Sequence, residues 1–338
     1  MSTMMKAVRL HAYGGPEVLT YEDAPVPAIG PGEVLVRVHA VGINPPDLYL
    51  RDGYRALPPE WRPDPAFPLI IGTDVSGTVE RMADDVTGFA PGEEVFAMVG
   101  FPEKLMTGSG AYAQFVSVPA TELARKPAGI DHIAAAGAPM SLLTAWQFLV
   151  DLGHDAPNPF QPVRHEPVPL KGRTVLVNGA SGGVGHLVVQ LATWKGARVI
   201  GVAAGRNAPL LRELGVDDVI DYKVENAEDV VSGVDLVIDA VGGAGMERFL
   251  RVLGPGGALF LVNPLGFQGQ DTARERGITV SSTQVRSNGP QLAEAARLLA
   301  DGTVRVEVGE TFPLAEAARA HERAMKGGVP GKVVLTVR

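Results

Sequence analysis

The chain has 338 residues, of which 46% are hydrophobic and 20% are charged, and its formal net charge at pH 7 is −8. This composition is that of a globular protein, and the length favours two domains. The acidic balance argues against binding to nucleic acid or to anionic membranes, since both need clustered Lys and Arg. The chain has no cysteine, which excludes disulfides and thiolate-bound metals.

The sequence carries no signal for export or for membrane insertion. Residues 1–10 lack the apolar stretch of a secretion signal. Apolar runs elsewhere fall short of the ~20 residues that a membrane-spanning helix needs. We therefore expect a cytoplasmic protein that contacts no membrane.

Residues 1–128 are predicted to form a β-rich domain. Apolar residues dominate the runs at 34–41 and 113–118, and turns rich in Gly and Pro occur at 31–32, 91–92 and 108–110. Short strands joined by tight turns are typical of a compact barrel-like domain.

From residue 129 the pattern alternates between strands and helices. Six apolar runs are predicted strands, at 174–177, 198–203, 218–220, 234–240, 257–262 and 278–284. Between the first two lies an amphipathic helix at 184–192. This alternation predicts a doubly wound parallel α/β sheet, the Rossmann architecture.

The last segments are expected to return to the first domain. Helices are predicted at 291–299 and 314–325, and a terminal strand at 332–337. Residues 1–128 and 286–338 would then form one domain, and residues 129–285 the other. Residues 153–169 contain five prolines and are predicted to be an exposed loop.

A glycine-rich turn joins the first predicted strand of the second domain to its helix. Glycine lets the backbone approach a pyrophosphate, and the N-terminus of the helix offers unpaired N–H groups to that anion. A turn without a ligand is the alternative, but the strand–turn–helix context favours dinucleotide binding. A P-loop is excluded, because no Gly-Lys-Ser/Thr follows. The residues of the turn that we assign to the cofactor are Gly179, Ser181, Gly182, Gly183, Val184 and Gly185.

The end of the second strand indicates which nicotinamide cofactor binds. A site that prefers NAD usually has Asp or Glu there, to hold the ribose 2′-hydroxyl. In this chain the strand runs instead into residues 204–207, which include Arg206 and no carboxylate. Arg206 either grips a 2′-phosphate through its guanidinium or is a solvated loop residue. The missing carboxylate favours NADP(H).

Several further motifs accompany this turn: GINPPDLYLRDGY at 42–54, PLIIGTDVSG at 68–77, LTAW at 143–146 and GKVVL at 331–335. Together with residues 178–185 they resemble the medium-chain dehydrogenase/reductase superfamily, and within it the zinc-independent, zeta-crystallin-like quinone oxidoreductase branch. The resemblance covers nearly the whole chain. It implies a GroES-like β-barrel catalytic domain completed by the C-terminus, a Rossmann domain and an active site in the cleft between them. It also implies NADPH as hydride donor and a homodimer.

The resemblance bears on metal chemistry as well. Zinc-dependent members of the superfamily have a Cys where this chain has Asn44 and a His where it has Thr73. Their four-cysteine structural zinc lobe has no counterpart here, so we expect no metal. Without a Lewis acid, hydrogen bonds must polarise the substrate oxygen. This suits hydride addition to an electron-poor C=C bond or quinone ring better than alcohol oxidation.

The resemblance also supplies candidate catalytic residues. Asn44 is expected near the nicotinamide as a donor to the substrate oxygen, and Asp47 as a residue that orients its neighbours. Tyr49 and Tyr54 either donate a proton or only line the pocket, because buried aromatic side chains more often pack than react.

On the cofactor side, the resemblance places Thr144 near the nicotinamide ring, Asn263 in contact with the cofactor and Tyr222 near the adenosine 2′-phosphate. Lys332 faces either the cofactor or solvent. Residues 153–169 either cap the cleft or decorate the surface.

Two other site chemistries have weak support. His154 and His165 lie in the proline-rich segment without a shared helical register, so a metal site is not expected there. Ser181 sits in a Gly-x-Ser-x-Gly sequence like that of a hydrolase nucleophile, but no convincing Asp and His follow it.

The leading hypothesis is an NADPH-dependent reductase whose substrate is a small quinone or α,β-unsaturated carbonyl. An enoyl-thioester reductase would need a longer pocket with basic residues at its mouth. A non-catalytic structural or regulatory protein would bind NADPH without turnover. The sequence alone leaves all three open.

Overall fold

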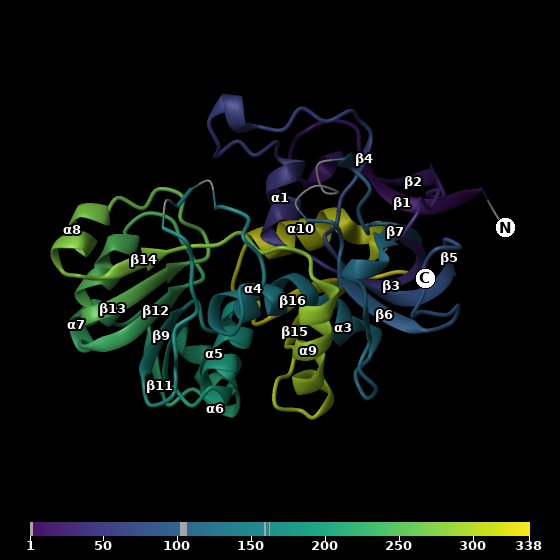
Figure 1. The fold of residues 1–338 in the computed structure, drawn as a ribbon. Coiled ribbons are helices and arrows are strands. Elements are labelled where there is room, and N and C mark those ends of the chain that lie inside the picture. Colours follow the sequence, from purple (N-terminus) through teal and green to yellow (C-terminus); the bar gives the residue numbers. More distant parts are fainter. Residues whose placement is uncertain (1–2, 102–106, 159, 162) are drawn as a thin grey trace. The chain divides into compact units, whose positions relative to one another are not determined.

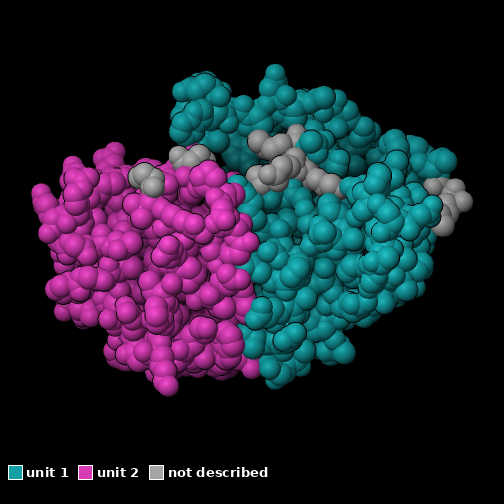
Figure 2. Space-filling view, viewed as in Figure 1, with its two compact units in different colours: residues 1–143, 286–302, 306–338 teal, residues 144–285, 303–305 magenta. Residues whose placement is uncertain are grey.

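The computed structural model describes residues 3–101, 107–158, 160–161 and 163–338 (Figure 1). The contacts within the chain divide it into two compact units (Figure 2). Unit 1 comprises Met1–Leu143, Arg286–Gly302 and Val306–Arg338, and unit 2 comprises Thr144–Val285 and Thr303–Arg305.

Unit 1 contains two β-sheets built from its N-terminal and C-terminal segments. The smaller sheet has the strand order β2-β1-β4, with β1 (Met4–Leu10), β2 (Leu19–Pro25) and β4 (Leu69–Ile70). The larger has the order β15-β16-β3-β5-β6-β8, and β7 also pairs with β3. Its strands are β3 (Glu33–Gly42), β5 (Asp74–Met82), β6 (Glu94–Met98), β7 (Phe115–Pro119), β8 (Ala124–Arg125), β15 (Val308–Pro313) and β16 (Lys332–Thr336).

The C-terminal strand β16 is an integral part of the larger sheet. It pairs antiparallel with β3, with Val334 opposite Gly42, and the N–H of Ile43 donates to the carbonyl of Val333 at 3.0 Å. This register brings Lys332 next to the residues that follow β3. The prediction that the last strand returns to the N-terminal region is confirmed.

The helices of unit 1 pack around these sheets. They are α1 (Pro45–Arg51), α3 (His132–Gly137), the first part of α4 (Pro139–Leu149), α9 (Gly289–Ala300) and α10 (Ala317–Met325), with 3₁₀ turns at Pro16–Val18, Pro59–Trp61, Ala120–Glu122 and Leu314–Glu316. Residues 129–143 belong to unit 1 by their contacts, whereas the sequence analysis assigned them to the Rossmann domain. The reason is that α3 packs on β3, β5 and β16. A Cβ at Gly42 would lie 2.3 Å from the carbonyl oxygen of Ala136.

Unit 2 is a six-stranded parallel sheet with the order β11-β10-β9-β12-β13-β14. Its strands are β9 (Thr174–Asn178), β10 (Arg198–Ala203), β11 (Asp218–Asp221), β12 (Val234–Asp239), β13 (Leu253–Leu261) and β14 (Thr279–Ser281). Numbered within the unit, this is the order 3-2-1-4-5-6 of the dinucleotide-binding Rossmann fold. The predicted α/β fold class is therefore confirmed, and all six predicted strands are present.

The helices of unit 2 are the remainder of α4 together with α5 (Gly185–Trp194), α6 (Ala208–Glu213), α7 (Ala227–Val230) and α8 (Gln270–Glu275), and 3₁₀ turns occur at Gly205–Asn207 and Met246–Arg251. The central strands are buried on both faces, as the adjacent Leu176 and Val177 of β9 and Val237 and Ile238 of β12 show. Each such side chain contributes about 1.5–3 kcal/mol by burial. Within the described ranges, no helix is long and apolar enough to cross a membrane.

The proline-rich segment 153–169 has no regular secondary structure in its described residues, but it is not fully exposed as the sequence predicted. His165 is buried, and its two ring nitrogens lie 3.0 Å from Ser281 Oγ and 3.0 Å from the carbonyl oxygen of Phe148. Burial lowers the pKa of His165 to about 4. A neutral histidine therefore anchors the segment to the end of β14.

A second buried histidine joins the C-terminal helix of unit 1 to its N-terminal part. The Tyr112 hydroxyl lies 2.8 Å from His321 Nε2, and Arg51 Nη1 lies 3.3 Å from His321 Nδ1. All three residues are buried. Burial, followed by the charge of Arg51, lowers the pKa of His321 to about 3, so the imidazole is neutral.

We predict that Tyr112→Phe destabilises the protein, because it removes the hydroxyl partner of the buried His321. The expected loss in the free energy of unfolding is about 1–3 kcal/mol, measured by urea denaturation. Tyr21→Phe is the matched control, since Tyr21 is 42% exposed. Equal midpoints for the two variants would show that the Tyr112–His321 contact contributes nothing.

Candidate functional site

The glycine-rich turn of unit 2 is held in a tight fold-back after β9. The carbonyl oxygen of Val202 accepts from the N–H groups of Gly179 at 3.0 Å and Ala180 at 3.1 Å. Gly179 has a φ of +77°, and a Cβ at Gly185 would lie only 2.0 Å from the carbonyl oxygen of Gly179. Glycine is thus required at both ends of the turn for steric reasons.

The turn presents free backbone donors at the start of a helix. In the described part of the chain, no hydrogen bond engages the N–H of Gly183 or of Val184, which directly precede α5. A helix N-terminus with unpaired N–H groups favours a bound anion. The geometry therefore fits the pyrophosphate of a dinucleotide.

A buried carboxylate lies beside this turn, and the sequence analysis did not single it out. Asp239, at the end of β12, accepts from Asn178 Nδ2 at 2.8 Å through Oδ1. The same oxygen accepts from the N–H groups of Val241 at 3.0 Å and Gly242 at 3.2 Å. Its Oδ2 is buried and has no hydrogen-bond partner among the described residues. Asp239 thus fixes the ends of the two central strands.

A second carboxylate lies at the end of β11, the strand next to β10. Asp221, at the end of β11, pairs in register with Ala203, and its Oδ2 lies 2.3 Å from where a Cβ on Gly205 would be. The sequence analysis found no acid at the tip of β10, because it considered only that strand. The tip of β10 itself has no carboxylate, but the neighbouring parallel strand places the Asp221 carboxylate beside the loop that follows β10.

The other residues expected near the adenosine lie at the same sheet edge. Arg206 is exposed in the 3₁₀ turn after β10, and Tyr222, directly after β11, is 57% exposed. Asn207 Nδ2 donates to Ser181 Oγ at 2.8 Å, which links this loop to the glycine-rich turn. The Arg206 guanidinium and the Asp221 carboxylate thus lie at the same end of the sheet and would act in opposite directions on a bound phosphate.

The residue expected near the nicotinamide ring, Thr144, and the asparagine expected to contact the cofactor, Asn263, also lie in unit 2. Thr144 is 5% exposed within α4. Asn263 follows β13, is half-buried and accepts from the N–H of Leu265 at 3.2 Å through Oδ1. A Cβ at Gly242 would lie 3.1 Å from that of Asn263, so the loops after β12 and β13 are in contact.

Unit 1 contains a cluster of buried polar side chains, which we call the Lys332 cluster. It is formed by Asn44, Asp47, Thr73, Asp74, Ser141 and Lys332, each at most 5% exposed. Asn44 and Asp47 come from the start of α1, Thr73 and Asp74 from the start of β5, Ser141 from α4 and Lys332 from the start of β16.

Lys332 is oriented into unit 1. Its Nζ donates to Asn44 Oδ1 and, at 3.2 Å, to Ser141 Oγ, and it lies 3.8 Å from Asp74 Oδ2. The side chain is therefore not solvent-facing, which was one of the two orientations that the sequence allowed.

The amide of Asn44 is fully engaged within the cluster. Its Nδ2 donates to Asp74 Oδ2 at 2.8 Å and to Thr73 Oγ1 at 3.0 Å. An amide nitrogen has two N–H groups. A substrate oxygen would therefore receive a hydrogen bond from Asn44 only if one of these two bonds were given up.

Burial controls the charges in the Lys332 cluster. It raises the pKa of Asp47 to about 7, with a further increase from the charge of Asp74. It raises the pKa of Asp74 to about 6, against the opposing effect of Lys332. Desolvation lowers the pKa of Lys332, while the two carboxylates oppose that shift. The Asp47 Oδ2 accepts from the Asn44 N–H at 2.8 Å, and its Oδ1 has no partner among the described residues.

The two candidate tyrosines are neighbours on and after α1. Their ring centroids are 6.0 Å apart, Tyr49 is 42% exposed and Tyr54 has a φ of +51°. Burial raises the pKa of both phenols, and the charge of Asp47 adds to the increase at Tyr54. Both therefore carry their proton at neutral pH, as a proton donor must.

Comparison with known proteins finds likeness over the whole chain. Residues 30–128 match the family model of the alcohol dehydrogenase GroES-like domain, and residues 214–335 match that of zinc-binding dehydrogenases. The mouse protein "NAD(P)H oxidoreductase RTN4IP1, mitochondrial" is 33% identical over 371 residues, which cover 99% of this chain and 90% of that one. The rat "Quinone oxidoreductase" is 30% identical over 348 residues, which cover 98% of each chain.

Solved structures show the same likeness. The quinone oxidoreductase from Coxiella burnetii superposes with a TM-score of 0.84 at 30% identity, covering 99% of this chain and 100% of that one. Mycobacterial Rv1454c complexed with NADPH gives a TM-score of 0.80 at 30% identity, covering 98% of this chain and 99% of that one.

The buried Asp47 carboxyl should make stability depend on pH. Because its pKa is raised from 3.8 to about 7 in the folded protein, the folded state holds a proton that the unfolded state has lost between these values. The contribution of Asp47 to the free energy of unfolding should therefore fall by up to about 1.4 kcal/mol per pH unit as pH rises through this window. Asp47→Asn lacks this contribution, so its stability relative to wild type should increase from pH 4 to 7 and then level off.

Urea denaturation at several pH values measures this difference. Asp271→Asn is the control, because the Asp271 side chain is 86% exposed. Parallel stability curves for Asp47→Asn and wild type across pH 4 to 7 would contradict the prediction.

Proposed function

Because the chain belongs to the medium-chain dehydrogenase/reductase superfamily and to its quinone oxidoreductase branch, we propose that it reduces a quinone or an α,β-unsaturated carbonyl with NADPH and without zinc. The family relation supports an oxidoreductase that uses a nicotinamide cofactor. The choice of NADPH, the independence from zinc and the roles of individual residues are the finer parts of the proposal.

The observation that carries the proposal is the glycine-rich turn with free N–H groups at Gly183 and Val184. A pyrophosphate bound there would accept hydrogen bonds from the unpaired N–H groups at the start of α5. Ser181, oriented by Asn207, adds a hydroxyl to the same anion. Thr144 and Asn263 would contact the nicotinamide half. These assignments place the cofactor at the carboxyl ends of the parallel strands, where α/β folds bind their ligands.

The chemistry of the Lys332 cluster supports a reaction without zinc. The positions at which zinc-dependent members of the superfamily have Cys and His are Asn44 and Thr73 in this chain. An ammonium group is hydrogen-bonded to Asn44 itself. A metal ion at that place would have to displace the Lys332 Nζ that is hydrogen-bonded to the Asn44 oxygen. In the described ranges, no group of three or more His, Asp or Glu side chains is arranged to hold a metal ion.

In this mechanism bound NADPH supplies the hydride to the electrophilic carbon of the acceptor. Negative charge then develops on the acceptor oxygen, and we assign its stabilisation to the Lys332 cluster. The Lys332 ammonium makes two hydrogen bonds inside the cluster, while an ammonium group has three N–H donors. Asn44 would act through this ammonium, which its Oδ1 holds in place. Tyr49 or Tyr54, both protonated at neutral pH, or water would deliver the proton.

Turnover of a quinone panel with NADPH tests this function. Gly182→Asp puts a carboxylate beside the proposed pyrophosphate and should weaken NADPH binding about tenfold or more. Gly182→Ala separates the effect of the charge from that of the added bulk, because its Cβ would lie 3.3 Å from the carbonyl oxygen of Gly179 but carries no charge. Dialysis against a chelator should leave the rate unchanged. Equal turnover in wild type and Gly182→Asp, or loss of activity on chelation, would overturn the proposal.

The preference between NADPH and NADH should depend on Arg206 and Asp221. Arg206→Ala removes a charged partner of the 2′-phosphate and should weaken NADPH binding about tenfold to a hundredfold, while NADH binding stays within about twofold. Asp221→Asn removes a like charge and should tighten NADPH binding several-fold. Calorimetric titration of both cofactors measures these effects. Arg212→Ala is the control, since Arg212 is exposed on α6. If the ratio of the Kd values for NADPH and NADH is unchanged in both variants, neither residue contributes to recognition of the 2′-phosphate.

We further propose a homodimer and a cytoplasmic location. The family resemblance supports the dimer. The mouse relative is described by its name as mitochondrial. Light scattering and fractionation of cells decide these two points.

A further inference from the structure

Segment 153–169 is hydrogen-bonded to the carboxyl end of β14 by three successive hydroxyl groups. His165 Nδ1 lies 3.0 Å from Ser281 Oγ, and Asn158 Nδ2 donates to Ser282 Oγ at 2.9 Å. His154 Nε2 lies 3.4 Å from Thr283 Oγ1. A surface decoration would not need a buried histidine and an amide to secure it. The described residues of this segment therefore have a defined position on unit 2.

That position lies at one end of the sheet edge where ligands bind. The strand order runs from β11 and β10 through β9 to β12, β13 and β14. In the proposed function the adenosine lies over β10 and β11, and the pyrophosphate lies after β9. A dinucleotide bound across this edge would have its nicotinamide half on the β12 to β14 side. Residues 281–283 and the segment bonded to them are on that side.

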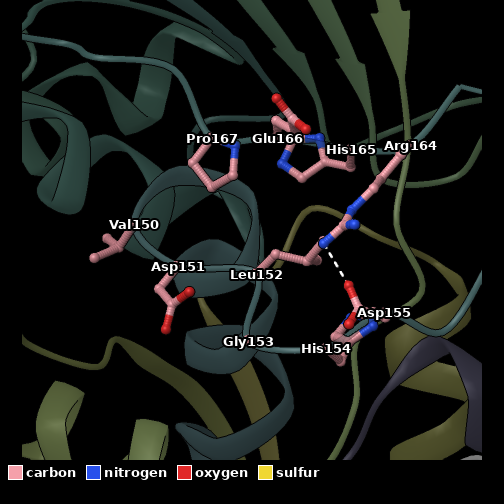
Figure 3. A pocket seen from close by; sticks show the side chains of 10 residues that line it. All are labelled: Val150, Asp151, Leu152, Gly153, His154, Asp155, Arg164, His165, Glu166 and Pro167. Atoms are coloured by element: carbon pink, nitrogen blue, oxygen red, sulfur yellow. Dashed lines mark ion pairs between the residues drawn. The ribbon is translucent and has the colours of Figure 1, made fainter.

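The segment borders two hollows that share one part of their lining, and the larger of them is open to solvent. The larger has a volume of about 480 Å³ (Figure 3), and the smaller, of about 160 Å³, is also lined by Ser282 and Thr283. Both are lined by Leu152, His154, Asp155, Arg164 and His165. Volumes of several hundred Å³ are typical of pockets for small molecules.

The lining combines apolar surface with polar donors. Figure 3 shows Arg164 extending toward Asp155, to which it is paired at 2.5 Å. Both side chains are largely exposed, at 64% and 84%, so this pair is weak and its donors are available to a ligand. Leu152, Val150 and Pro167 supply apolar contacts to the larger hollow. Because polar groups make up most of the lining of the larger hollow, this lining suits a flat ring that carries carbonyl oxygens.

We propose that segment 153–169 forms a wall of the acceptor site and selects acceptors by size, binding the part of a multi-ring quinone that lies beyond the reacting ring. This inference rests on the proposed function for its substrate class. It assigns Arg164 and His154 to specificity and gives them no part in hydride or proton transfer.

The test compares a one-ring with a three-ring quinone in variants that fill or open the hollow. Arg164→Trp adds bulk to a residue that lines both hollows. It should raise the KM for the three-ring quinone about tenfold or more, while the KM for the one-ring quinone and the Kd of NADPH change by less than about twofold. Arg164→Ala should reduce the discrimination between the two quinones. Arg274→Trp is the matched control, because Arg274 forms a similar exposed pair with Asp271 in unit 2.

Equilibrium binding of the three-ring quinone to the protein saturated with NADP⁺ is measured alongside turnover. If wild type reduces no quinone, the proposed function fails, while a weaker Kd in Arg164→Trp than in Arg274→Trp still supports the wall. Equal KM and Kd values in these two variants would overturn the inference. A change confined to NADPH binding would overturn it as well, because the hollow would then belong to the cofactor.

Discussion

A buried ammonium group determines how the polar residues of unit 1 are arranged. Lys332 is bonded to Asn44 and Ser141 and lies near the Asp74 carboxylate. Leaving any of these charges buried without its partners would cost several kcal/mol. The cluster is therefore stable only when β16 lies in register beside β3. The hydrogen bonds of Asn44 follow from this arrangement, since its oxygen is held by the ammonium and its nitrogen by Asp74 and Thr73.

In unit 2 the corresponding constraint is the parallel register of the six strands. It gathers the ends of β9, β10, β11 and β12 at one edge, where the glycine-rich turn, Asp221 and Asp239 are found. Helix N-termini and carboxylates at this edge have opposite preferences for a phosphate. The proposed choice of cofactor is thus a balance between neighbouring strands. Segment 153–169 is anchored to β14 at the same edge.

Much of this architecture could be predicted from the sequence because it depends on local pattern. The six parallel strands, the glycine-rich turn and the final strand each have a short sequence signature. The failures concern contacts between distant segments. Asp221 lies beside the tip of β10 because of strand register, and the burial of His165 depends on Ser281, 116 residues away. Likewise, the sequence suggested Asn44 as a free donor, and only the positions of Thr73 and Asp74 show that its amide is occupied.

The pairing of β16 with β3 also has a consequence for synthesis on the ribosome. Unit 2 is nearly complete once residue 285 has emerged, lacking only Thr303–Arg305, whereas unit 1 needs its last strand to finish the larger sheet. Until then, the β3 edge that β16 will cover stays open, and Asp47 and Asp74 have no ammonium beside them. In nascent chains unit 2 should therefore fold while the larger sheet of unit 1 is still incomplete. Unpaired strand edges of this kind can aggregate, and chaperones can bind them.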